Sequence, residues 1–133
     1  MVKKTTFLVI AIISLFMLTA CGILTSSSNN KKNNEYISIV TEGTFYDYPD
    51  TYVGDAFNAF FSHPTWDYYQ SDENEHIVTF NGGAEYLGEV VNVNLEFEVD
   101  PLTEEFEVVW SDFNDFKLSD ADYTDLLDTV FSY

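Results

Sequence analysis

Beyond its first 34 residues the chain almost lacks positive charge. Arginine is absent from the whole sequence, and the only basic residue after Lys32 is Lys117. All 23 acidic residues lie in the same stretch, from Glu35 onward. A surface this negative repels nucleic acids and anionic lipid headgroups. The composition therefore argues against binding to DNA, to RNA or to acidic lipid.

Cysteine is nearly absent too, and Cys21 is its one occurrence. Upstream of it lie Lys3, Lys4 and an apolar run over residues 7–18 that only Ser14 interrupts. A membrane-spanning helix needs about 20 apolar residues, whereas the apolar core of a signal peptide spans about 7–15. The run therefore predicts an export signal over residues 1–20.

The four residues Leu18-Thr19-Ala20-Cys21 resemble the lipobox of bacterial lipoprotein precursors. The resemblance implies that the thiol of Cys21 receives a diacylglyceryl group and that the peptide is cut just before it. Acyl chains such as palmitate would then hold the new N-terminus in the lipid bilayer, where two chains anchor stably and one is marginal. The implied location is the outer side of the cell membrane, or the outer membrane of a Gram-negative envelope. The alternative is a chance cysteine behind an ordinary signal peptide.

The rest of the chain divides into a tether and one domain. Residues 21–34 are rich in Ser, Asn and Lys, a composition typical of a flexible segment. Residues 35–133 predict a single acidic domain. With Cys21 lipidated, no thiol remains for a disulfide, so this domain depends on its core. The aromatic content of the chain, 12 Phe, 9 Tyr and 2 Trp, argues against disorder.

Two segments have the apolar spacing of helices. The first follows Asp50 and Thr51, either of which can cap it, and ends before Pro64. The second follows Ser119, which can cap it in the same way. The apolar stripe of the first helix is Val53, Ala56, Phe57, Phe60 and Phe61, and that of the second is Tyr123, Leu126, Leu127, Val130 and Phe131.

Four strands are predicted between these helices, over residues 66–70, 76–80, 90–99 and 106–110. An extension of the second strand to Tyr86, past a bulge at Gly82-Gly83, is left open. The predicted fold is α+β: a helix, a four-stranded antiparallel meander and a helix, with both helices packed on one face of the sheet. The expected core face carries Val91, Val93, Leu95, Phe97, Val99, Phe106, Val108 and Trp110. The opposite face carries Asn92, Asn94, Glu96, Glu98, Glu105 and Glu107.

The stretch YPDTYVGDAFNAFFSHPTW, followed by V-x-F-N-G-G, resembles a small domain of uncharacterised bacterial lipoproteins and envelope proteins. Its order of elements is also similar to the two-layer fold of the beta-lactamase inhibitor protein and of small outer-membrane assembly lipoproteins. The resemblance implies a binding domain rather than an enzyme. It assigns no functional residue.

Motifs for catalysis are missing from the sequence, which has no GxSxG, HExxH or phosphate-binding loop. We interpret His63 and His76 as solvated or capping residues. The segment SDADYTD suggests calcium, but an EF-hand loop starting at Asp120 would need Gly and Glu where Asp125 and Phe131 stand. We therefore expect no enzyme activity, catalytic residue, metal or cofactor.

Three function classes remain. We expect a non-catalytic surface lipoprotein that binds a basic envelope or extracellular protein. The first alternative is an inhibitor or immunity-type protein that neutralises a basic protein such as a cell-wall hydrolase, and the second is a small enzyme or calcium-dependent module. If the acidity reflects adaptation of the organism to salt, it carries no information about a partner. The predicted partner-binding residues are Tyr69, Tyr86, Glu96, Glu98, Glu105 and Glu107.

Replacing the cysteine tests the anchor directly. Cys21→Ser is expected to abolish lipidation and to leave an uncleaved or wrongly cleaved precursor, because serine has no thiol to be alkylated. Incorporation of a labelled fatty acid in cells measures the effect. Equal incorporation into the wild type and the variant would contradict the lipoprotein prediction.

Overall fold

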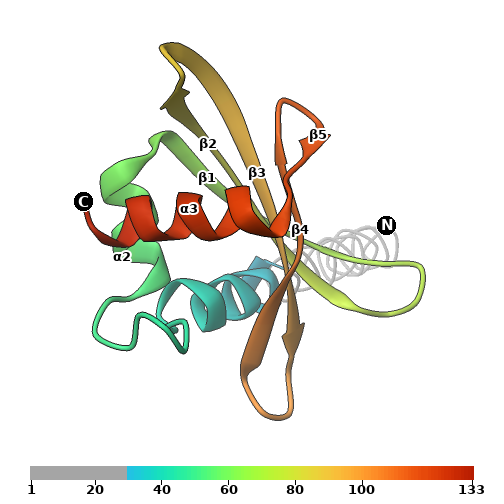
Figure 1. Ribbon diagram of the computed structural model, residues 1–133. Coiled ribbons are helices and arrows are strands. Elements are labelled where there is room, and N and C mark those ends of the chain that lie inside the picture. The colour runs from blue at the N-terminus through green and yellow to red at the C-terminus, as the bar shows by residue number, and fades with distance from the viewer. Residues whose placement is uncertain (1–29) are drawn as a thin grey trace, which may run out of the picture. The chain divides into compact units, whose positions relative to one another are not determined.

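The computed structural model describes residues 30–133 (Figure 1), so the predicted signal peptide, the lipobox-like residues and Cys21 lie outside the described residues. The first described element is the helix α1, which covers residues 30–41. The later elements are α2 (Val53–Phe60), β1 (Ser62–Gln70), β2 (His76–Tyr86), β3 (Glu89–Asp100), β4 (Glu105–Phe113), β5 (Phe116–Lys117) and α3 (Asp120–Phe131).

The strands form one antiparallel meander in the order β1-β2-β3-β4-β5. Figure 1 shows the three helices against one side of this sheet, with α3 crossing over the strands. A single core cluster joins buried residues of all three helices to the inward face of β2 and β3. The α+β meander with helices on one face is therefore confirmed, with β5 added as a short fifth strand. Among residues 30–133 no helix is long and apolar enough to cross a membrane.

The helix α1 was not predicted, and it makes the last five residues of the expected tether helical. Tyr36 and Val40 lie four residues apart on one face of α1 and are buried in the core. The chain leaves the helix at Gly43, where a Cβ atom would clash with the ring of Phe106 and the carbonyl oxygen of Ile39. A glycine is therefore needed for this close approach.

The predicted N-cap residue is correct for one of the two predicted helices and wrong for the other. Ser119 caps α3 as expected, because its hydroxyl accepts a hydrogen bond from the backbone N–H of Asp122 at 3.2 Å. The expected caps of α2 were wrong. That helix has Tyr52 at its N-cap position, without a side-chain hydrogen bond, and it ends at Phe60.

The second strand does extend to Tyr86, but the expected bulge at Gly82-Gly83 was wrong. Pairing of β2 with β3 continues without a shift from His76 to Tyr86. The irregularity lies instead in β1, between Ser62 and Thr65. Gly82 has a packing role, because a Cβ atom there would lie 2.8 Å from both Phe61 and Phe80.

A bulge in β4 contradicts the placement of Trp110 on the core face. Glu96 pairs with Trp110, whereas its neighbour Phe97 pairs with Val108, so Val109 is an extra residue. One extra residue reverses the alternation of a strand. The residues before the bulge therefore keep the predicted faces, and Trp110 turns to the side that the helices leave uncovered.

Six aromatic residues outside the predicted apolar stripes divide into a packed pair and an exposed group. Phe45 and Tyr48 pack against the core, whereas the other four are exposed by 43 to 97%. Tyr48 also donates a hydrogen bond to Asp128 of α3 and stacks on Phe131 with the ring centroids 4.4 Å apart. This hydrogen bond, followed by burial, raises the pKa of Tyr48 to about 12. The exposed residues are Tyr46, Tyr52, Tyr69 and Tyr86.

The alternation of β3 can be tested by comparing two neighbouring residues. Phe97 has no exposed surface, so Phe97→Ala is expected to cost about 3–5 kcal/mol of unfolding free energy. Glu98→Ala is expected to change it by no more than about 0.5 kcal/mol, because Glu98 lies on the uncovered face. Urea unfolding measures both, and equal midpoints would contradict the assigned faces.

The contact between Tyr48 and Asp128 predicts a change at alkaline pH. Asp128→Asn is expected to lower the pKa of Tyr48 from about 12 toward 10, which the ultraviolet absorbance of tyrosinate would detect. Native Tyr48 keeps its proton to a higher pH than the unfolded chain does. Its contribution to stability is therefore complete below about pH 10 and is lost as the pH rises toward 12. Asp125→Asn, which makes the same charge change on α3, should leave this titration unchanged.

Candidate functional site: an acidic sheet face

The side of the sheet away from the helices collects the predicted glutamates. In β3, Leu95 and Phe97 point to the core, so Glu96 and Glu98 point the other way. The register of β4 then adds Glu107 opposite Glu98, and Glu105 opposite Asp100. We call this surface the acidic face. Its carboxylates belong to Asp67, Glu96, Glu98, Asp100, Glu105, Glu107 and Asp112.

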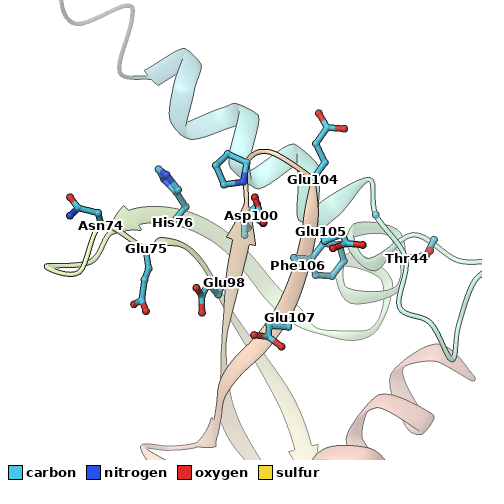
Figure 2. A pocket seen from close by; sticks show the side chains of 13 residues that line it. Thr44, Asn74, Glu75, His76, Glu98, Asp100, Glu104, Glu105, Phe106 and Glu107 are labelled. Carbon is cyan, nitrogen blue, oxygen red and sulfur yellow. The ribbon is translucent and has the colours of Figure 1, made fainter.

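The acidic face continues into a groove at the β3–β4 turn, with a volume of about 790 Å³. Figure 2 shows that its walls come from the start of β2, the end of β3, the start of β4 and the segment after α1. The acidic lining residues are Glu75, Glu98, Asp100, Glu104, Glu105 and Glu107. His76 also lines the groove. Six carboxylates around one groove create a strongly negative local potential, which attracts cations.

Tyr69 lies on the acidic face, as predicted. Its hydroxyl donates a hydrogen bond to a carboxylate oxygen of Glu96 at 3.5 Å. Burial, followed by the negative charge and the hydrogen bond of Glu96, raises the pKa of Tyr69. The tyrosine hydroxyl therefore stays protonated and remains a donor to the acidic residues around it.

Tyr86 does not lie at the edge of this face, which corrects its predicted position. It follows Ala84 on the side of β2 that faces the helices, and its ring contacts Phe113 with a centroid distance of 5.2 Å. It lies at the β2–β3 turn, the opposite end of β3 from the acidic groove. The structure brings together Tyr69 and the four glutamates, without Tyr86.

Trp110 and Asp112 belong to the acidic face but were not predicted there. Asp112 is only 4% exposed, and it accepts hydrogen bonds from the indole N–H of Trp110 at 2.6 Å, the amide of Asn94 at 3.0 Å and the backbone N–H of Asp115 at 3.0 Å. These donors offset the cost of burying its charge. The ammonium group of Lys117 lies 5.3 Å from the centroid of the Trp110 ring. No local pattern signals this cluster, because it exists only through the bulge at Val109.

His76 is half-buried and held by two tyrosines. Its Nδ1 atom lies 2.9 Å from the hydroxyl of Tyr68, and its Nε2 atom lies 3.3 Å from the hydroxyl of Tyr36. The rings of Tyr36 and His76 stack with their centroids 4.3 Å apart. These contacts join α1 to β1 and β2, so the geometry gives His76 a role in packing. The interpretation of His76 as a solvated or capping residue was wrong.

The remaining candidate residues are His63 and the aspartates of the segment SDADYTD. His63 is exposed in the irregular start of β1. Asp120 and Asp122 lie in the first turn of α3, where negative charge interacts favourably with the helix dipole. Within the part of the chain that the structure describes, no three His, Cys, Asp or Glu side chains are arranged to hold a metal ion.

A scan against protein-family models, a search of curated proteins and a search of solved structures each find no match for this chain.

Proposed function

We propose that this chain is a lipid-anchored protein on the outer side of the cell membrane, held in the bilayer by acylated Cys21. Its domain binds a positively charged envelope or extracellular protein through the acidic face. The observation that supports this most is the concentration of carboxylates on rigid strands, with Lys117 as the only basic side chain after Lys32.

The pairing of β3 with β4 creates a repulsion between carboxylates that a basic partner would reduce. Glu98 and Glu107 are directly opposite each other on β3 and β4, and like charges in that position destabilise a sheet. Figure 2 shows both side chains on the same side of the two strands. A lysine or arginine of a partner placed between them would remove the repulsion and form charge-assisted hydrogen bonds.

A second candidate function is an inhibitor or immunity-type protein that neutralises a basic protein such as a cell-wall hydrolase. The groove at the β3–β4 turn favours it, because a concave site lined by carboxylates can receive a protruding basic segment of an enzyme. Dense negative charge also accelerates association with a basic partner. Both candidates use the same surface and are non-catalytic.

The acidic face can be tested by removing its charge without changing its shape. A partner is first captured from cells with the full-length chain in detergent. The triple variant Glu96→Gln, Glu98→Gln and Glu107→Gln is then expected to slow association, measured by surface plasmon resonance, more than it accelerates dissociation. Binding of the wild type should weaken as salt rises, since the Debye length falls from about 10 Å at 0.1 M to about 3 Å at 1 M.

A matched control separates the acidic face from the net charge of the domain. The variant Asp47→Asn, Asp50→Asn and Asp55→Asn loses the same three charges from the loop before α2 and from its first turn. Its association rate should stay closer to that of the wild type. An unchanged rate in the glutamine variant, or equal losses in the two variants, would contradict binding through the acidic face.

A further inference from the structure

A second concave surface lies at the opposite end of the sheet, between α3 and the ends of β2 and β4. It is a small groove of about 140 Å³. An engineered apolar cavity of about 150 Å³ is large enough to bind benzene, so the groove has room for one aromatic or branched side chain. Its lining residues are Phe60, Ala84, Glu85, Tyr86, Phe113, Asp122, Asp125, Leu126 and Thr129.

Aromatic rings form the walls of this groove. Tyr86 and Phe113 are in contact with a centroid distance of 5.2 Å, and the ring of Tyr133 packs edge-on against Phe60 at 5.5 Å. Ala84 also lines the groove, and its side chain is a single methyl group. Tyr86 is 46% exposed, so the aromatic lining is accessible from solvent.

Exposed apolar residues also occur at this end of the sheet. Figure 1 shows the β2–β3 turn and the β4–β5 hairpin projecting at the same end of the sheet, and a hydrogen bond from the backbone N–H of Asn92 to the side chain of Asn114 joins the two. Leu87 in the β2–β3 turn is 87% exposed, and Phe116 in β5 is 79% exposed. Exposed apolar side chains near a groove are typical of a binding site for another protein.

The rim of the groove carries negative charge. Asp122 and Asp125 lie on α3 at one side, and Glu85 lies on β2 at the other. A second copy of this chain would bring the same carboxylates face to face, and anionic lipid would also be repelled. An apolar side chain flanked by lysine or arginine would fill the groove and pair with its rim.

We propose that this groove binds a basic amphipathic segment of a partner protein, with one aromatic or aliphatic side chain of that segment inserted between Tyr86, Phe113 and Leu126. We call it the anchor groove. The proposal does not depend on the acidic face, because the anchor groove opens on the helix side of the sheet. It also assigns a role to Tyr86, a residue that the sequence associated with a different surface.

The test uses the full-length chain in phosphatidylcholine nanodiscs and three fluorescent peptides. The first peptide is an amphipathic segment with leucine and phenylalanine four residues apart among lysines. In the second, glutamate replaces lysine, and in the third, serine replaces the two apolar residues. Fluorescence anisotropy is expected to detect the tightest binding for the first peptide, because only that peptide offers the anchor groove both an apolar side chain and flanking positive charge. The serine peptide keeps only its charge attraction to the acidic carboxylates, which weakens as salt rises.

Two alanine variants, which replace tyrosines of similar solvent exposure, show where the peptide binds. Tyr86→Ala is expected to weaken binding of the lysine peptide at least about tenfold, as for other aromatic residues at the centre of an interface. Tyr52→Ala, which removes a tyrosine of 55% exposure that lines neither groove, should leave it unchanged. The double variant Asp122→Asn and Asp125→Asn should reduce the salt dependence of binding.

Several outcomes would overturn the proposal. The serine peptide binding as well as the lysine peptide would mean that charge alone attracts it. An unchanged affinity after Tyr86→Ala would place the site elsewhere. If the wild type sediments as a dimer and the Tyr86→Asp variant as a monomer, a second copy of the chain occupies the groove. The glutamine variant of the acidic face should still bind the lysine peptide more tightly than the serine peptide, so failure of one proposal leaves the other intact.

Discussion

Phe97 has no exposed surface and lies in the central strand, where its ring contacts Phe45, Phe57, Trp66 and Phe106. These rings belong to the loop after α1, to α2 and to the strands β1 and β4. One buried side chain therefore contacts four other parts of the fold. No cysteine lies between residues 22 and 133, so no disulfide can form there, and the domain depends on this aromatic packing. It also determines the opposite face, because burying Phe97 forces Glu96 and Glu98 outward.

The single extra residue Val109 shapes both surfaces of the sheet. Before the bulge, Phe106 and Val108 face the core, and after it, Ser111 and Phe113 do. Without the extra residue, Phe113 would point away from the helices and could not form a wall of the anchor groove with Tyr86. Bulges commonly redirect side chains near functional sites, and here one bulge places an indole on the acidic face and a phenyl ring in the groove.

The two candidate binding surfaces use different physics. The acidic face acts through charge over a distance of about a Debye length, so it affects encounter rates and salt dependence. The anchor groove acts through contact, since burial of an apolar side chain in an aromatic pocket slows dissociation. The domain can use both proposed surfaces, because they lie on opposite sides of the sheet and neither needs the other to be occupied.

The sequence by itself determined the parts of the structure that depend on local periodicity. Period-two alternation in β3 and at the start of β4 predicted which residues are buried and that Glu96, Glu98, Glu105 and Glu107 share one face. The apolar stripe and Ser119 predicted α3. Only the tertiary structure decided the rest. The helix α1 carries too few apolar residues to be recognised, and Tyr36 and Val40 become core residues only when β1 and β2 lie beside them. No sequence pattern within β4 indicates the bulge at Val109, because the bulge is a shift in the pairing of β4 with β3. The neighbours of Tyr86 and Trp110 depend on that shift.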